Sequence, residues 1–203
     1  MRTTLNQRTP NRAGEDRRER IVAALDACIR KTGFAGSSLT DIAAEAGITP
    51  SHVRYYFESK EDILEYYLSS LSAEILAEIG AIPRDDPERW LEDFSRYFSS
   101  NPKVSSTGIG VLMEIFGVSV HHPKLAAIKR GHDVQIRNVF REFFVWAGVA
   151  EGLTVEDAAY TGWALDSGMK FNAAFQADFS LERAGQIFRR EMRRLAGWPP
   201  KPE

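Results

Sequence analysis

The sequence predicts an all-α protein with two parts, on three observations. Apolar residues recur at three- and four-residue spacings along the chain, without sustained alternation of β-branched residues. Capping residues or proline precede the apolar stripes, and glycine often follows them. The 203 residues are 43% hydrophobic with a single cysteine, so the chain can bury a core but cannot form an internal disulfide. Three short helices should precede six longer ones, with the boundary near residue 58.

The first two helices are expected over residues 15–32 and 38–46. Gly33 suits the position that ends a helix, because glycine adopts the left-handed conformation without strain. Ser38 begins the second helix, and Asp41, three residues later, can complete a capping box with it.

The third helix is short and follows a tight turn at Gly47. Thr49 can cap it, and Pro50 suits its first turn, where the missing N–H is not needed. Val53 and Phe57, four residues apart, should face the second helix. Two short helices joined by a glycine turn form a helix-turn-helix.

Six further helices are expected in the second part. Each combines a start signal with an apolar face, for example Pro123, Thr154 and Ser180 at three of the starts. Residues 99–107 should form a loop, and 198–203, with three prolines, an irregular tail. The helices are expected over 59–80, 86–98, 108–118, from 123 to beyond 143, 154–177 and 180–196.

The outward face of the third helix has the composition of a DNA-reading surface. Hydroxyls, an imidazole and a guanidinium lie opposite or beside Val53, with no carboxylate among them. Arginine can bond guanine through two hydrogen bonds, and hydroxyls can reach bases or phosphates. The alternative is an ordinary helical hairpin with a polar outer face. The residues of this face are Ser51, His52, Arg54, Tyr55 and Tyr56.

Residues 1–14 are expected to form a flexible basic arm. Arg2, Arg8 and Arg12 come before any acidic residue, in a segment without apolar periodicity. The alternative is a disordered terminus that has no function. Residues 1–60 hold 10 Lys and Arg against 7 Asp and Glu, an excess too small to indicate a polyanionic partner by itself.

The segment from Phe34 to Glu61 closely resembles the DNA-binding segment of the TetR (tetracycline-repressor-like) family of bacterial regulators. Asp41-Ile42-Ala43, Glu45-Ala46-Gly47, the pair Tyr56-Phe57 and Ser59-Lys60-Glu61 all fall in register. The resemblance covers roughly the first third of the chain. The remainder is similar in layout only, through its six further helices.

The resemblance implies a homodimer that binds a pseudo-palindromic, double-stranded operator and is released by a small-molecule effector. It implies a helix-turn-helix DNA-binding domain over 15–58 and a ligand-binding and dimerisation domain over 59–197, followed by a disordered tail over 198–203. Many family members carry tyrosine where this chain has Arg54, so the operator cannot be inferred by analogy. The candidate DNA contacts are Ser38, Thr49, Ser51, His52, Arg54, Tyr55, Tyr56 and Lys60.

In this family the last two long helices form the dimer interface, here 154–177 and 180–196. Small residues would let the helices of two subunits approach closely. The alternative is that they serve helix formation within one subunit. These residues are Ala158, Ala159, Gly162, Ala164, Ala173 and Ala174.

The aromatic residues of the second part can frame an apolar cavity between helices, where bundle proteins bind ligands. For each of them, core packing is the alternative. Asp166 lies in an otherwise apolar stretch and needs a partner, either a neighbouring helix or a ligand. A carboxylate with tryptophans would favour a cationic or amine ligand. The candidate ligand-binding residues are Trp90, Phe94, Met113, Phe116, Phe140, Trp163 and Asp166.

Other functions have weaker support in the residues. His121, His122 and His132 could be metal ligands, but a polar turn before Pro123 explains the adjacent pair better. Cys28 lies on a buried helix face, and no catalytic motif, cofactor site or metal site is expected. An activator, a regulator without a ligand, a protein-binding adaptor and an unknown enzyme remain alternatives. We expect a cytoplasmic protein, because neither a secretory signal nor a bilayer-spanning run is seen.

Overall fold

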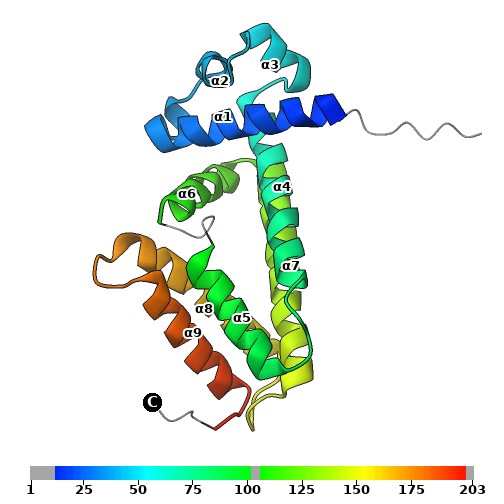
Figure 1. Cartoon of the computed structure of the whole chain (residues 1–203), viewed down its shortest axis with the longest axis vertical. Coiled ribbons are helices and arrows are strands. Elements are labelled where there is room, and N and C mark those ends of the chain that lie inside the picture. The colour runs from blue at the N-terminus through cyan, green and yellow to red at the C-terminus, as the bar shows by residue number, and fades with distance from the viewer. Residues whose placement is uncertain (1–11, 102–105, 200–203) are drawn as a thin grey trace, which may run out of the picture. The chain divides into compact units, whose positions relative to one another are not determined.

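The computed structural model describes residues 12–101 and 106–199, and every regular element in these ranges is an α-helix (Figure 1). The all-α prediction is therefore confirmed. The helices are α1 (Arg12–Gly36), α2 (Leu39–Glu45), α3 (Pro50–Tyr56), α4 (Lys60–Gly80), α5 (Pro87–Ser100), α6 (Ser106–His121), α7 (Pro123–Ala147), α8 (Val155–Phe175) and α9 (Leu181–Leu195).

The first helix differs from the expectation at both ends. It begins at Arg12, so the last residues of the predicted arm 1–14 are helical, while Arg2 and Arg8 lie outside the described residues. Gly33 leaves helical geometry, with φ 75° and ψ 165°, as its expected position at a helix end requires. A further helical turn follows it as far as Gly36.

The chain divides into two compact units, Met1–Tyr67 and Leu68–Glu203, and the division falls within α4 rather than at residue 58. The first unit is built on α1, α2 and α3. Its core joins the inner faces that the spacing of apolar residues predicts, because α2 packs against both α1 and α3. The buried side chains include Ile21, Leu25, Ile42, Val53, Phe57 and Leu64.

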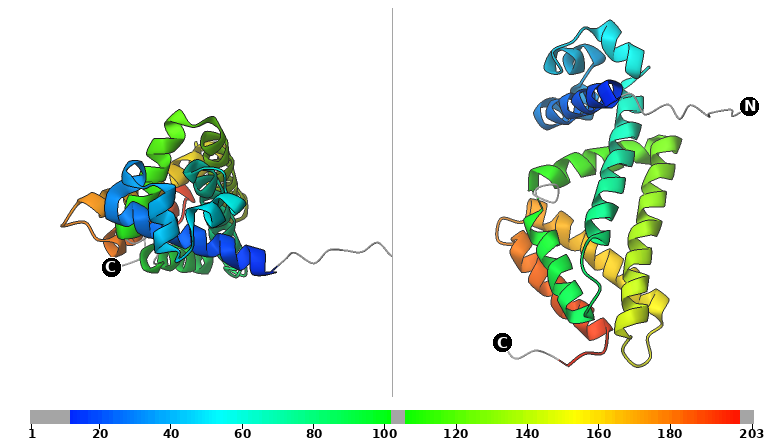
Figure 2. Two further views of the ribbon diagram at one scale, coloured as in Figure 1. Left: turned by 90° about the horizontal axis from the view of Figure 1, so that it is seen from above. Right: turned by 45° about the vertical axis from the view of Figure 1, so that its right-hand side comes forward.

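In the second unit, α5 and α8 both pack against α9, and α8 also packs against α7 (Figure 2). Polar residues begin these helices by accepting hydrogen bonds at the exposed N–H groups of the first turn. Asp86, His122, Thr154 and Ser180 are the N-cap residues. The core between the helices is mostly aromatic. It contains Trp90, Phe94, Phe140, Phe143, Phe144 and Phe188.

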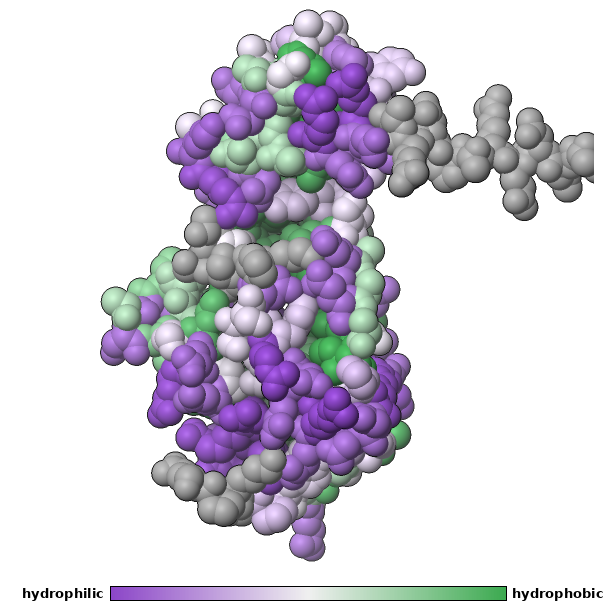
Figure 3. Space-filling view, in the orientation of Figure 1, coloured by the Kyte–Doolittle hydropathy of each residue, from purple (hydrophilic) through white to green (hydrophobic). Residues whose placement is uncertain are grey.

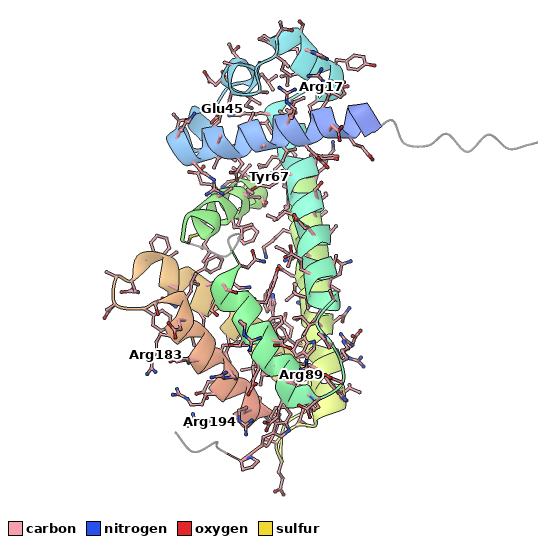
Figure 4. The ribbon with its side chains drawn as sticks, viewed as in Figure 1. Arg17, Glu45, Tyr67, Arg89, Arg183 and Arg194 are labelled. Carbon is pink, nitrogen blue, oxygen red and sulfur yellow. The ribbon has the colours of Figure 1, made fainter. Side chains whose placement is uncertain are left out.

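The outer surface of α5 and α9 is hydrophilic (Figure 3). Arg183 and Arg194 extend outward from α9 (Figure 4). Phe188 and Met192, on the opposite side of the same helix, are completely buried. This division of α9 into a charged face and an apolar face is what a surface helix requires. Within the described residues, no helix is long and apolar enough to cross a bilayer.

Candidate DNA-binding surface and ligand cavity

The turn before α3 depends on Gly47, which has a φ of 66°. A non-glycine residue is strained in this left-handed conformation. The N–H of Gly47 donates to the carbonyl of Ala44 at 3.1 Å, which closes the end of α2. Arg20 of α1 donates from Nη2 to the carbonyl of Ala46 at 2.9 Å. The turn therefore has a defined direction, and it sets the direction in which α3 leaves.

Thr49 and Pro50 begin α3 as the sequence predicts. The hydroxyl Oγ1 of Thr49 accepts from the N–H of His52 at 3.3 Å, and it lies 3.0 Å from the hydroxyl of Ser51. Val53 is fully buried, so the opposite side of α3 must face outward. The residues of α3 include no acid.

The outward face of α3 is graded in exposure. Ser51 and Arg54 are exposed, and Tyr55 is 79% exposed. His52 and Tyr56 are half-buried, with their ring centroids 5.6 Å apart. The ring of Tyr55 meets that of Tyr56 edge to face at 5.0 Å, so the aromatic side chains support one another. Ser51, Arg54 and Tyr55 are thus the α3 side chains most open to a partner.

Ser38 is a cap of α2 in the structure. Its hydroxyl donates to Oδ2 of Asp41 at 2.6 Å, and its backbone N–H donates to the same oxygen at 2.9 Å. The N–H of Asp41 donates back to Oγ of Ser38 at 3.2 Å, which completes the predicted capping box. These hydrogen bonds from Ser38, the hydroxyl first, lower the pKa of Asp41. The side chain of Ser38 therefore already holds α2.

Lys60 also has a role within the first unit. Its ammonium donates to the carbonyls of Phe34 and Ser37, at 2.9 and 3.0 Å. It also lies 4.4 Å from the centroid of the Phe34 ring, within cation–π range. Lys60 is one of the candidate DNA contacts, but two of its three ammonium hydrogens are directed at carbonyl groups that follow the break at Gly33. Lys60 thus connects the start of α4 to the end of α1.

Two arginines of α1 support the helix-turn-helix without a signal in the sequence. Arg20 caps the end of α2, and Arg18 stacks over the rings of Phe57 and Tyr66, at 5.6 and 5.7 Å. Their partners are distant in sequence, and helical spacing identifies only neighbours three or four residues apart. Glu45, labelled in Figure 4, is likewise reached from α1, by an ion pair with Lys31 at 2.6 Å.

The second unit contains a cavity of about 310 Å³ lined by α4, α5, α6, α7 and α8. This volume is within the range of small-molecule sites. Four of the seven predicted ligand-binding residues line it. They are Phe94, Phe116, Trp163 and Asp166.

The other three predicted ligand-binding residues are not among those that line the cavity. Trp90 is stacked between Phe94 and Phe143, with ring centroids 5.0 and 5.1 Å away. Phe140 is fully buried and packs on Phe94 and Phe188. Met113 is half-buried on α6. For Trp90 and Phe140 the structure favours the core-packing alternative, because neighbouring rings cover them.

Two ion pairs contribute polar groups to the cavity. Asp166 is 5% exposed, and its Oδ2 accepts from Nζ of Lys170, one turn along α8, at 2.8 Å. Lys129 donates to both carboxylate oxygens of Asp133, one turn along α7, at 2.6 and 2.5 Å. The side chain that pairs with Asp166 is thus on its own helix, whereas the sequence predicted a partner on a neighbouring helix or a ligand.

Tyr97 and His132 line the cavity, although neither is among the predicted ligand-binding residues. Burial, followed by the hydrogen bond that Tyr97 donates to Glu78 at 2.9 Å, raises the pKa of the Tyr97 phenol. Burial lowers the pKa of His132, an effect that the neighbouring Asp133 opposes. Tyr97 lies one turn after Phe94, so it was open to prediction once α5 was placed.

His122 and Cys28, considered above as a possible metal ligand and a possible nucleophile, have structural roles. His122 is the N-cap of α7, where its Nδ1 faces the N–H of Leu125 at 3.5 Å. Cys28 is buried, and burial raises the pKa of its thiol, which disfavours the nucleophilic thiolate. No group of three or more His, Cys, Asp or Glu that could hold a metal occurs in the part of the chain that the structure describes.

Residues 21–67 match the sequence profile of the TetR family of bacterial regulatory proteins. This match covers α2, α3 and the turn between them, together with α1 from Ile21 onward and the start of α4. The chain carries the DNA-binding segment of the TetR family. The matched segment contains the helix-turn-helix, and the eight candidate DNA contacts all lie inside it.

Curated relatives of the chain are transcriptional regulators. The HTH-type transcriptional regulator BetI of Stenotrophomonas maltophilia is 26% identical over 123 residues, which cover 59% of this chain and 63% of that protein. BetI of Ectopseudomonas mendocina is 26% identical over 121 residues, covering 58% and 62%. The chain thus spans less than two thirds of the length of these relatives.

Solved structures share the fold. A transcriptional regulator from Rhodococcus sp. Rha1 has a TM-score of 0.78 at 22% identity, covering 89% of this chain and 96% of the other. A regulator from Saccharomonospora viridis in complex with choline has a TM-score of 0.69 at 21% identity, covering 86% and 94%. The helical second unit is therefore an arrangement found in other regulators.

The small residues of α8 divide between two environments. Ala158 and Ala159 are buried in the core of the second unit. Gly162 faces Met192 of α9, whose Sδ lies 2.9 Å from the place of a Cβ, so a side chain there would displace it. Ala164, in contrast, is exposed. Three of the predicted interface residues therefore serve packing within the chain.

Proposed function

We propose that this TetR-family regulator is a cytoplasmic repressor. It binds a pseudo-palindromic operator as a homodimer and releases it when a small molecule occupies the cavity of the second unit. The exposed, acid-free face of α3 carries the proposal. Three side chains with donor groups stand in solvent there, at the position of the recognition helix in the matched segment.

In this proposal the DNA contacts divide into reading and positioning groups. Arg54 reads a base, because its exposed guanidinium has the geometry for two hydrogen bonds to guanine. Ser51 and Tyr55 contact bases or phosphates beside it. Ser38, Thr49 and Lys60 act mainly by holding α2, α3 and the end of α1 in place, through their hydrogen bonds within the unit.

A two-fold operator requires a two-fold protein. The outward side of α8 offers a surface for a second copy of the chain. Its ends carry exposed aromatic rings, Tyr160 at 56% and Phe175 at 71%. Between them lie Ala164, which is exposed, and Gly168, whose missing Cβ would have no neighbour within 4 Å. Small residues flanked by aromatic rings allow a partner helix to approach closely and bury apolar area.

The proposed effector acts through α4. This helix begins in the DNA-binding unit, and its later residues Leu68, Leu71 and Ile75 line the cavity. A ligand that prefers one position of these residues shifts the population of α4 conformations, and with it the spacing of the two recognition helices. The coupling is reciprocal, so operator DNA should weaken ligand binding by the same factor. The choline complex of the Saccharomonospora regulator supports a small-molecule site in this fold.

Selection of bound sites from random double-stranded DNA with the purified protein tests the function. We expect a pseudo-palindrome with half-sites about one helical turn apart, roughly 34–36 Å, or a multiple of it. A protein without sequence preference at physiological salt would contradict the proposal. Enrichment of a single asymmetric site would contradict the homodimer only.

A further inference from the structure

Two buried polar atoms at the cavity lack a hydrogen-bond partner within the described part of the chain. They are Oδ1 of Asp166 and Nδ1 of His132, from α8 and α7. The side chain of Asp166 is 7% exposed, so solvent reaches it little. Buried polar atoms are nearly always paired in folded proteins, and an unpaired one is costly. Oδ1 of Asp166 can accept a hydrogen bond from a donor group that lies in the cavity.

The charged side chains among the described lining residues form two ion pairs. Among the described lining residues, Lys129 is paired with Asp133, and Lys170 with Asp166. Burial lowers the pKa of His132, which favours its neutral form. A ligand with a net charge would therefore enter an apolar space without a free counter-charge, which is unfavourable. This balance argues against the cationic ligand that a carboxylate beside tryptophan suggests.

The remaining lining is apolar and largely aromatic. Phe94, Tyr97, Phe116, Trp163 and Phe171 contribute rings from α5, α6 and α8. Phe116 and Phe171 meet edge to face, with ring centroids 6.3 Å apart. Such walls favour a flat apolar body and provide few polar groups to orient it. The orienting contacts fall to Asp166 and His132.

We propose that the cavity binds a neutral, mainly apolar molecule with a hydroxyl group, such as an alkylphenol, and that this hydroxyl donates to Oδ1 of Asp166. The inference rests on the proposed function in taking the cavity for the effector site. A hydroxyl donor to a carboxylate forms a strong, charge-assisted hydrogen bond and adds no net charge. A second polar group on the ligand can pair with Nδ1 of His132, which donates or accepts according to its tautomer.

Four matched probes distinguish the ligand classes by calorimetry on the full-length protein. They are 4-butylphenol, 4-butylanisole, which lacks the donor, 4-butylbenzylamine, which is cationic, and 4-butylbenzoate, which is anionic. We expect the phenol to bind at least about 10-fold more tightly than the other three, as a hydrogen bond to a charged group implies. Equal or tighter binding of any other probe would overturn the proposal, as would no binding of the phenol.

Asp166→Asn and Asp133→Asn form a matched pair of variants. Each removes one ion-paired carboxylate from the lining, but only Asp166 has an oxygen without a partner, since both oxygens of Asp133 accept from Lys129. Asp166→Asn should weaken 4-butylphenol binding about 10-fold or more, and Asp133→Asn should weaken it much less. Equal losses in two variants with unchanged circular dichroism would refute the role of Asp166.

The probe series on the unaltered protein keeps the test valid if Asp166→Asn does not fold. Selection of operator sites separates this inference from the proposed function. A protein that selects a pseudo-palindrome but prefers a charged probe would retain the regulator function and refute only the ligand class. A protein that selects no site but prefers the phenol would refute the regulator function and retain the ligand class.

Discussion

At the scale of single residues, Arg54 is the side chain on which operator preference should depend most. It is exposed on α3, and no salt bridge within the described residues uses it. Tyr55 beside it is more exposed, but a phenol offers one donor where a guanidinium offers a planar fork. Specific base recognition should therefore come from Arg54, with Tyr55 in a supporting position.

Arg54→Ala should weaken binding to the selected operator by roughly 1–3 kcal/mol and relax the preference at one base pair in each half-site, because the fork to guanine is lost. Titration of labelled operator and random DNA measures both effects. Arg189→Ala, exposed on α9, is the control for loss of one positive charge. Equal losses on operator and random DNA would instead identify Arg54 as a phosphate contact.

Lys60→Met should lower the free energy of unfolding by about 1–3 kcal/mol, since it removes charge-assisted hydrogen bonds to Phe34 and Ser37. Lys31→Met, which breaks the exposed pair with Glu45, should cost at most about 1 kcal/mol. Urea unfolding compares the two. The slope of the logarithm of DNA affinity against the logarithm of salt concentration should stay unchanged in Lys60→Met. A slope shallower by about one would show that Lys60 contacts a phosphate.

His132 should make the protein less stable in mild acid. Its pKa in the folded chain lies below the ordinary 6.5, chiefly through burial. The unfolded chain therefore takes up a proton first as the pH falls, and stability drops below about pH 6.5. Among the charged groups around it, Asp133 and Asp166 oppose this shift, while Lys129 and Lys170 add to it.

The check is urea unfolding of His132→Gln at pH 7.5 and at pH 5.5. The variant should lose less stability between these two pH values than the unaltered protein, because it cannot take up that proton. His121→Gln, at an exposed position, is the matched control and should leave the loss unchanged. A loss as large in His132→Gln as in the unaltered protein would show that other groups cause it.

At the scale of elements, the turn between α2 and α3 determines the direction of the recognition helix. Gly47→Ala should destabilise the protein by about 1–2 kcal/mol, because its φ of 66° strains any side chain. Steric conflict is not the cause, since the nearest atom to the added Cβ, Nη2 of Arg20, is 4.0 Å away. Operator affinity should fall with stability as α3 loses its direction.

Gly131→Ala is the matched control for this glycine substitution. Gly131 lies inside α7, where an added Cβ meets nothing within 4 Å. Alanine should stabilise the helix there by about 0.5–1 kcal/mol. Urea unfolding and operator titration of both variants separate the two effects, and destabilisation by both substitutions would contradict the role of the left-handed turn.

At the scale of the whole molecule, the proposed homodimer depends on the outward side of α8. Ala164→Arg places a long charged side chain between Tyr160 and Phe175, and it should yield a monomer in sedimentation experiments. The monomer should lose cooperative binding to the two half-sites but keep the fold of each unit. Ala127→Arg, exposed on α7, should leave the dimer intact. A dimer that persists in Ala164→Arg would place the interface elsewhere.

The sequence by itself determined the elements and the family. Capping residues, glycines and apolar spacing are local signals, so the order of the helices, the caps at Ser38, Thr49, Thr154 and Ser180, and the left-handed turn at Gly47 were all predictable. The start of the recognition helix was predicted where it is observed, because Thr49 and Pro50 mark it.

Only the tertiary structure decided what the polar side chains do. Lys60 bonds carbonyls near the end of α1, Arg20 caps α2, and Gly162 makes room for Met192 rather than for a second subunit. Likewise, Tyr97 and His132 line the cavity, whereas Trp90 packs in the hydrophobic core. These contacts join residues far apart in sequence, and their geometry follows from how whole helices pack, which no local pattern encodes.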